Sequence, residues 1–221
     1  MQAESRVISS AQTDVHADLR KLFDRHLAQP WRKPFAAYNE RALDAALAAH
    51  AGWNAHAPLV LDAGCGVGWS TLHLAREFPG HFVIGVDQSA ARLERGKPEQ
   101  LPENAVLVRA DLVDFWRLLA RAGVRLDRHY NLYPNPWPKI GHLSRRWHGH
   151  AVFPVWRELG GMLECRSNWR VYIEEMALAL GWLAASPVAA ERYRPARGIT
   201  PFEQKYLASG HELWRCRVHL G

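Results

Sequence analysis

Short apolar runs alternate with amphipathic segments along most of the chain. The runs are rich in Val, Leu and Ile, which is typical of buried strands, whereas the segments between them have helical spacing of apolar residues. Strands are expected at residues 58–62, 81–87, 105–110, 130–133, 161–165 and 212–220, and helices at residues 71–78, 90–95, 112–122, 155–159 and 169–183. This alternation is typical of β-α-β units, and near-continuous apolar strands favour a sheet that is covered on both faces. The pattern therefore predicts an α/β protein built on a parallel sheet.

The first fifty residues follow a different pattern. Residues 15–49 are expected to be helical, with Pro30 and Pro34 dividing the segment in two, because proline interrupts a helix. We therefore expect an N-terminal helical extension over residues 1–50 and an α/β domain over residues 51–221.

The composition is that of a folded protein. Of the 221 residues, 48% are hydrophobic and 23% are charged, which excludes a mainly disordered chain. The three cysteines are far apart in the sequence, which argues against a disulfide scaffold. Residues 1–15 lack the apolar core of a signal peptide, and the longest apolar run, residues 176–185, is half of the ~20 residues that a membrane span needs. We expect a cytoplasmic protein that does not enter a membrane, and the choice between monomer and homodimer stays open.

The positive charge is concentrated in one part of the chain. The net charge is +6, and residues 121–150 hold six basic residues against one acidic residue, together with four His. A basic stretch interleaved with aromatic residues is the pattern expected for contact with nucleic acid. The same stretch is equally compatible with a solvated surface that is rich in Arg.

A glycine-rich turn, Gly64-Cys-Gly66-Val-Gly68, follows the first predicted strand and precedes a helix. Glycine allows positive φ angles and close approach of a ligand, and a helix N-terminus offers unpaired N–H groups. Asp87 ends the next strand, 21 residues after Gly66, where a carboxylate can accept hydrogen bonds from both hydroxyls of a ribose. These residues predict a site for a cofactor that contains a nucleoside.

The glycine spacing distinguishes two kinds of cofactor. A dinucleotide fingerprint, G-x-G-x-x-G, requires glycine at position 69, which is Trp69 here. The spacing G-x-G-x-G instead resembles motif I of class I S-adenosylmethionine methyltransferases. Asp62 suits a cofactor with a sulfonium and an amino group better than a pyrophosphate. Asp111, after the third strand, lies where that fold contacts the adenine amine, and it is about as well suited to cap the next helix.

The most specific motif is Pro134-Asn135-Pro136-Trp137-Pro138-Lys139, a loop that three prolines stiffen. His142 and Arg145-Arg146 follow it, and Thr200-Pro-Phe202-Glu203 and Gly210-His211 occur near the C-terminus. The chain thereby resembles the bacterial tRNA (guanine-N7-)-methyltransferase family, which has D-P-W-P-K, a His, paired Arg, T-x-F-E and Gly-His in the same order.

This resemblance extends over roughly residues 58–219. It implies a Rossmann-like class I methyltransferase fold: a mostly parallel seven-stranded sheet with an antiparallel last strand and helices on both faces. It also implies S-adenosyl-L-methionine as cofactor and tRNA as partner.

The resemblance implies a set of site residues as well. The candidates for the cofactor are Asp62, Gly64, Gly66, Gly68, Asp87, Asp111 and Asn135. The candidates for the substrate are Trp137, Lys139, His142, Arg145, Arg146, Asn168, Thr200, Phe202 and Glu203. Asn135, the candidate catalytic residue, and Asn168 stand where the family has Asp, so the chain looks like a divergent member.

The chemistry that the resemblance implies requires little from the protein beyond alignment. Guanine N7 has a lone pair and no proton to lose, so its methylation needs no general base. An acid at position 135 would accept hydrogen bonds from guanine N1–H and the 2-amino group, whereas Asn135 accepts only one of them. Glu203 is the remaining acid that could accept the other, and a surface helix position or a pair with a nearby Arg is the alternative for it. Trp137 or Phe202 is expected to stack on the base, with packing of the loop as the alternative for Trp137. Phosphate contacts are expected from Lys139, Arg145 and Arg146.

The same residues allow three other interpretations: a metal site, a different methyl acceptor and a protein without catalysis. The histidines near residue 142 have no Cys or acid at ligand spacing, so no metal site is expected. Asn-Pro-Trp also resembles the (N/D)-P-P-(Y/F/W) loop of amino-methyltransferases, which would direct methylation to an exocyclic amine of another base or of a small molecule. The absence of both family acids is also compatible with a relative that binds RNA or cofactor without catalysis.

Overall fold

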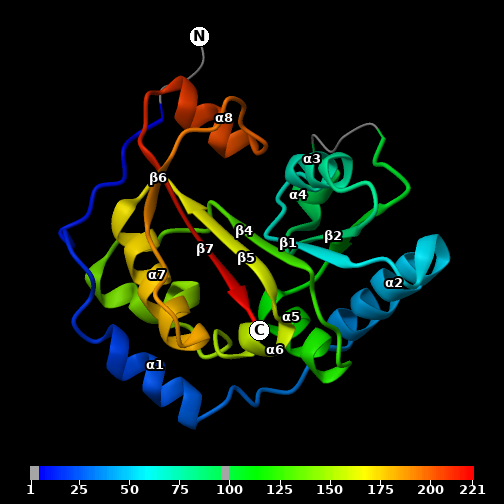
Figure 1. Ribbon diagram of the computed structural model, residues 1–221, viewed down its shortest axis with the longest axis horizontal. Helices are drawn as coiled ribbons and strands as arrows, with labels where there is room; N and C mark the ends of the chain where they lie inside the picture. Colours follow the sequence, from blue (N-terminus) through cyan, green and yellow to red (C-terminus); the bar gives the residue numbers. More distant parts are fainter. Residues whose placement is uncertain (1–4, 96–99) are drawn as a thin grey trace.

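The computed structural model describes residues 5–95 and 100–221, and within them the strands form one seven-stranded sheet (Figure 1). In sheet order the strands are β3 (Ala105–Arg109), β2 (Phe82–Asp87), β1 (Leu59–Ala63), β4 (Arg128–Leu132), β5 (Gly161–Ser167), β7 (Leu213–Leu220) and β6 (Glu191–Tyr193). The first five are parallel to one another, whereas β7 is antiparallel to both β5 and β6. The predicted fold, with its antiparallel last strand, is confirmed. The strand order reverses beside β1, and open α/β sheets bind their ligands at such a point.

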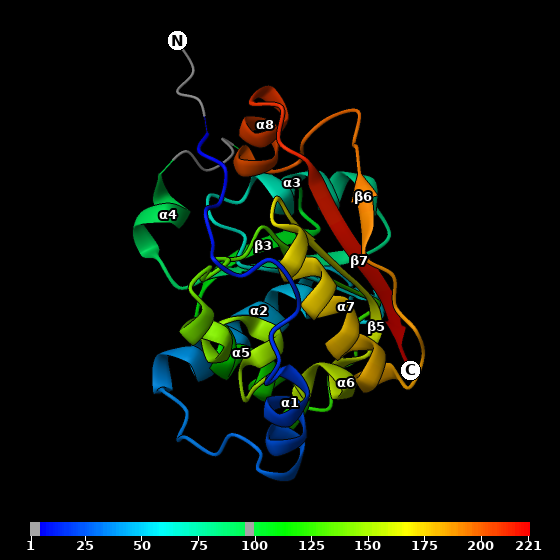
Figure 2. The same cartoon turned by 90° about the vertical axis from the view of Figure 1, so that its left-hand side faces the viewer.

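Helices cover both faces of the sheet, as predicted (Figure 2). They are α1 (Leu19–Ala28), α2 (Ala37–Asn54), α3 (Trp69–Glu77), α4 (Ala90–Glu94), α5 (Leu112–Arg121), α6 (Val155–Leu159), α7 (Arg170–Ala184) and α8 (Pro201–Ala208). Alternate strand residues point to opposite faces. In β1, Leu59 and Leu61 therefore join the core formed with α2, α5, α6 and α7, while Val60 faces α3.

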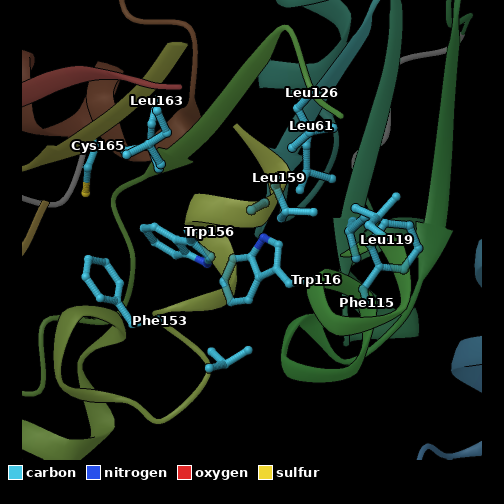
Figure 3. Packing of buried hydrophobic residues seen from close by; sticks show 14 of the residues in the cluster. Leu61, Phe115, Trp116, Leu119, Leu126, Phe153, Trp156, Leu159, Leu163 and Cys165 are labelled. Atoms are coloured by element: carbon cyan, nitrogen blue, oxygen red, sulfur yellow. The ribbon is translucent and has the colours of Figure 1, made fainter. Parts of the chain in front are cut away.

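The larger core is built around indole rings (Figure 3). Trp116 of α5 and Trp156 of α6 are fully buried, with ring centroids 5.0 Å apart and planes at 63°, a favourable edge-on arrangement. The indole N–H of Trp116 donates to Nε2 of His129, and burial lowers the pKa of His129 to about 3. His129 is therefore a neutral acceptor that lets an indole N–H be buried.

The sequence pattern does not predict the short strand β6, helix α8 or the two short 3-10 helices at Ile140–Arg145 and Trp147–Gly149. The three-residue strand β6 is too short to show alternation. Thr200 is the N-cap of helix α8, and its hydroxyl accepts from the backbone N–H of Glu203 at 2.9 Å. The T-x-x-E motif therefore also starts a helix. In addition, α2 continues to Asn54 and packs Leu43 into the main core. The division into two parts at residue 50 stays a prediction.

Residues 5–16, called here the N-terminal strap, run along the outside of the fold from α8 towards α1 (Figures 1 and 2). The hydroxyl of Ser10 donates to the carbonyl of Pro138 at 2.5 Å, and Gln12 Nε2 donates to Glu175 of α7 at 2.7 Å. The strap therefore ties the proline-rich loop to α7. Within the described residues, no helix has the length and apolar composition to cross a membrane, and no group of three or more His, Cys, Asp or Glu could hold a metal ion.

Candidate active site

A cavity of about 780 Å³ lies at the carboxyl ends of the parallel strands, with α8 forming one wall. It brings together ten of the sixteen predicted site residues: Gly64, Gly66, Asp87, Asp111, Asn135, Trp137, Arg145, Asn168, Thr200 and Phe202. Six do not line it: Asp62, Gly68, Lys139, His142, Arg146 and Glu203. Residues from the glycine turn and from the last third of the chain thus meet in one cavity.

The glycine turn after β1 leaves one end of the cavity open. Gly64 and Gly66 have φ angles of 85° and 61°, a region that side chains disfavour, and a Cβ at Gly66 would meet no atom within 4 Å. Asp87 is buried beside them. Its Oδ2 accepts from the N–H of Gly66 at 3.1 Å and from Arg92 at 3.1 Å, and its Oδ1 accepts from the N–H of Ser89 at 2.8 Å. These bonds fix the carboxylate at the edge of the cavity, and its contact with a ribose stays a prediction.

Asp62 and Gly68 do not line the cavity but stabilise the glycine turn. Oδ2 of Asp62 accepts from the hydroxyls of Ser70 and Thr71 at 2.6 and 2.7 Å. Burial raises the pKa of Asp62 to about 6, although these two hydrogen bonds lower it. A Cβ on Gly68 would lie 2.7 Å from a methyl carbon of Leu107, so that glycine permits close packing of the turn on β3. The structure gives both residues packing roles, and their contact with cofactor stays a prediction.

Asp111 and Asn131 also line the cavity. Oδ1 of Asp111 accepts from the N–H of Val113 at 2.8 Å and so caps α5, the alternative that the sequence left open. Asn131 of β4 is buried, and its Nδ2 has no hydrogen-bond partner among the described residues. A buried donor without a partner is costly, so this amide suits a polar ligand in the cavity.

The proline-rich loop forms the other end of the cavity and has a strained backbone. Tyr133 and Trp137 have φ angles of 52° and 45°, which cost non-glycine residues of order 1–3 kcal/mol each. Oδ1 of Asn135 accepts from the N–H of Trp137 at 3.3 Å, and the guanidinium of Arg145 lies 4.8 Å from the centre of a Trp137 ring. The loop thus places an exposed amide and an indole beside an exposed cation.

Arg146 is the clearest correction to the sequence-based site. It is 0% exposed and forms an ion pair with Glu175 at 2.6 Å. It also donates to Gln12 of the N-terminal strap and to the carbonyls of Trp137 and Lys139. The prediction that Arg146 binds phosphate is therefore wrong, because the side chain is enclosed and fixes the loop from inside.

Glu203 is also enclosed. Its Oε1 accepts from the hydroxyl of Tyr133 at 2.7 Å and from Arg166 at 3.1 Å, and its Oε2 accepts from the N–H of Ile199 at 2.7 Å. Burial, with the Glu203 charge beside it, raises the pKa of Tyr133. The fully buried Glu203 joins α8 to β4 and β5 and does not reach the cavity, so it is not the second acceptor for the base.

The basic stretch at residues 121–150 does not form one patch. Arg121 pairs with Glu40 at 2.9 Å, Arg125 donates to backbone carbonyls, and Arg128 lies over the ring of Phe78 at the start of β4, away from the cavity. Arg145 reaches the cavity wall, whereas the exposed Lys139 and the partly buried His142 do not line it. The charge count along the sequence therefore overstated the basic surface at the site.

Several cavity residues were missed in the sequence. Tyr133 and Tyr206 line the cavity, and Phe202 and Tyr206 are stacked with ring centroids 6.1 Å apart. Tyr133 directly precedes the proline-rich loop, and Tyr206 follows Phe202 by one helical turn. Both residues could therefore have been identified as site candidates because they neighbour these motifs. The buried Arg166, which does not line the cavity but donates to Glu203 and Glu164, could not be identified, because its partner Glu203 is 37 residues away.

The sheet order, the antiparallel β7 and the glycine turn facing a carboxylate at the end of β2 define a class I S-adenosylmethionine-dependent methyltransferase. S-Adenosylmethionine is the cofactor of this class, and the open glycine turn, Asp87 and the unpartnered amide of Asn131 fit its ribose and polar groups. A family model described as a putative methyltransferase matches residues 56–216, and the chain belongs to this family.

Curated relatives carry a more specific name. The tRNA (guanine-N(7)-)-methyltransferase of Acidovorax sp. (strain JS42) is 31% identical over 185 residues, which are 77% of this chain and 71% of that protein. The protein of the same name from Burkholderia thailandensis is 31% identical over 167 residues, which are 72% of this chain and 63% of that protein. The chain thus spans about two thirds of the length of these relatives.

Solved structures show the same fold at low identity. The aminoglycoside resistance methyltransferase NpmB1 superposes with a TM-score of 0.54 at 19% identity, covering 86% of this chain and 95% of that one. The 16S rRNA methyltransferase KamB gives a TM-score of 0.52 at 18% identity, with the same coverage.

Proposed function

We propose that the protein transfers a methyl group from S-adenosylmethionine to N7 of a guanine in tRNA. The observation that carries the proposal is the single cavity that joins the glycine turn and Asp87 to the proline-rich loop, Asn168 and α8. The names of the curated relatives support the same substrate. Because tRNA is the proposed substrate, we expect the protein to act in the cytoplasm.

The proposed reaction needs orientation more than proton transfer. Bound S-adenosylmethionine supplies an activated methyl group. Guanine N7 attacks with its lone pair and has no proton to lose, so no residue has to act as a base. The work of the protein is to hold the base in line, and orientation can contribute up to ~7–11 kcal/mol to a barrier. The lack of need for a base agrees with a cavity in which Asn135 and Asn168 stand where the family has two acids.

The base would be held by amides and aromatic rings. Asn135 and Asn168 line the cavity from different elements and can each accept one hydrogen bond from the N1–H or the 2-amino group of guanine. Phe202 is 58% exposed at the cavity and is backed by Tyr206, so its ring is available for stacking, which contributes ~1–3 kcal/mol per base. Two acceptors and one stacking ring would replace the family's paired carboxylates.

The phosphate contacts would come from Arg145 and Lys139, which are exposed at or beside the cavity. Arg121 is a matched control, since it is also exposed but lies at the end of α5 and pairs with Glu40. We expect Arg145→Ala to weaken tRNA binding and Arg121→Ala to leave it unchanged.

The test is methyl transfer from labelled cofactor to unmodified tRNA, followed by nucleoside mass analysis. 7-Methylguanosine is the expected product. Methyladenosine or methylcytidine would favour the alternative of an exocyclic amine, and cofactor binding without any methylated nucleoside would favour a non-catalytic relative.

A further inference from the structure

Asn168 is joined to the N-terminal strap through one histidine. It directly follows β5 and lines the cavity, and its Nδ2 lies 3.2 Å from Nδ1 of His211. The other ring nitrogen of His211, Nε2, lies 2.9 Å from the backbone carbonyl oxygen of Ser5. The ring also stacks on Tyr206, with centroids 5.2 Å apart and planes at 14°.

These two contacts determine which nitrogen of His211 carries the hydrogen. A backbone carbonyl only accepts, so Nε2 must donate to Ser5. A neutral imidazole with its hydrogen on Nε2 has a lone pair on Nδ1, which therefore accepts from the amide NH₂ of Asn168. The network thus turns the nitrogen of the amide towards His211 and leaves its oxygen for a ligand.

We propose that His211 is a positioning residue that holds the Asn168 amide with its Oδ1 available to accept a hydrogen bond from the guanine. The identity of the base rests on the proposed function. The strap takes part through the Ser5 carbonyl, which holds the ring in the tautomer that accepts from Asn168. Free rotation of the amide would otherwise present NH₂ to the N–H groups of guanine, two donors facing each other.

The same argument explains why an amide suits this position. A carboxylate has no hydrogen to donate, so with Asp at 168 Nδ1 of His211 would have to donate as well. Both ring nitrogens would then carry a hydrogen. Asn168 and His211 therefore form a matched pair in which the amide goes with a neutral ring.

The tautomer can be measured on the whole protein without substrate. A long-range ¹H–¹⁵N correlation spectrum distinguishes protonated from unprotonated imidazole nitrogens, and the His211→Phe variant identifies the His211 signals. We expect Nε2 to be protonated and Nδ1 unprotonated, with both protonated in Asn168→Asp. A hydrogen on Nδ1 in the wild type, or an unchanged spectrum in Asn168→Asp, would overturn the proposal.

Kinetics test whether the orientation matters for the reaction. His211→Phe keeps a ring on Tyr206 but removes both nitrogens, and Asn168→Ala removes the amide. Each should lower kcat/KM for tRNA by about three- to tenfold, the effect of one neutral hydrogen bond, while the Kd of S-adenosylmethionine is unchanged. The double variant should be no worse than Asn168→Ala, because His211 acts only through that amide. His211→Gln, which can both donate and accept, should recover part of the loss.

A control separates orientation from loosening of the strap. Ser209→Ala removes the hydroxyl that accepts from the N–H of Ser5 at 3.0 Å but leaves both contacts of His211, with Asn168 and with the Ser5 carbonyl, so it should keep wild-type kinetics. Effects of Asn168→Ala and His211→Phe that multiply in the double variant would contradict the inference. If the wild type made no 7-methylguanosine, the proposed function would fail, and the spectrum would still decide the role of His211.

Discussion

Two neighbouring arginines should respond in opposite ways to the same substitution. Arg145 is exposed at the cavity, whereas Arg146 is enclosed and paired with Glu175. We consider Arg145→Met and Arg146→Met, which remove the charge but keep an unbranched side chain of similar reach. The sequence offers no way to distinguish the two positions, so the contrast tests the structure itself.

The magnitude for Arg146 follows from what its loss leaves behind. Burial alone would raise the pKa of Glu175, but the hydrogen bond from His148 and the charge of Arg146 lower it to about 2. Without Arg146, the buried carboxylate keeps hydrogen bonds from Gln12, the N–H of His16 and His148 but loses the cation that pairs with its charge. Breaking a buried ion pair in this way costs about 3–5 kcal/mol. At an m value of about 2–3 kcal/mol per molar, the urea midpoint falls by about 1–2.5 M.

The assays are urea unfolding and tRNA binding over a range of salt concentrations. Arg145→Met should change the unfolding free energy by no more than about 0.5 kcal/mol and reduce the slope of log affinity against log salt by about one. Arg146→Met should lower the midpoint and leave the salt slope of the folded protein unchanged. Adding Glu175→Gln to Arg146→Met should restore about 1–3 kcal/mol, because the unpaired buried charge is removed.

Two results would refute this reasoning. One is a wild-type urea midpoint for Arg146→Met, which would mean that the side chain is not enclosed. The other is a reduced salt slope for Arg146→Met together with a normal slope for Arg145→Met, which would exchange the roles of the two residues.

Three further predictions concern the cavity and the turn behind it. Asp87→Ala should weaken S-adenosylmethionine binding about ten- to hundredfold, as expected when hydrogen bonds to a charged acceptor are lost, and calorimetry that gives wild-type affinity in a folded variant would contradict the assignment. The folded pKa of Asp62, about 6, lies above its unfolded value, so the native state binds the proton more tightly and stability falls as pH rises from about 4 to 6. As pH rises over that interval, the free energy of unfolding of Asp62→Asn, measured in urea, should increase by up to about 3 kcal/mol relative to that of the wild type. If the two unfolding free energies instead change in parallel with pH, the pKa of Asp62 is not raised. Asn135→Asp should raise single-turnover methylation of guanine about five- to hundredfold by adding a charged acceptor, and a drop in the rate would favour an amide-specific role for Asn135.

The parts of the fold that could be predicted are those with local causes. The glycine turn, Asp87 and Asp111 each follow an apolar strand, so sequence spacing alone places them at one edge of a parallel sheet. The short strand β6 has no such signature, because its three residues become a strand only by pairing with β7 about twenty positions later. Thr200 and Glu203 carry the signal for α8, but the resemblance assigns the same two residues to the substrate, and the sequence alone does not decide between a helix position and a substrate role for Glu203.

The parts of the site that could not be predicted depend on distant partners. Arg146 is buried because Gln12 and Glu175, 134 and 29 residues away, surround its guanidinium. Glu203 is removed from the cavity by Tyr133, 70 residues before it. Charge and motif identify these residues as functional candidates, whereas their exposure is decided by the tertiary structure.

The place of β7 in the sheet has a consequence for protein synthesis. β7 lies between β5 and β6 but is translated after both, and α8 lies between β6 and β7 in the chain. On the ribosome, the strands that carry the glycine turn and Asp87 can therefore pair before α8 has a sheet to anchor it. The glycine turn and Asp87 would come together first, and α8 would complete the cavity only once β7 emerges. We therefore expect the ribosome-bound protein to pass through a stage in which the end of the cavity at the glycine turn is formed but the wall at α8, where the proposed substrate would bind, is not.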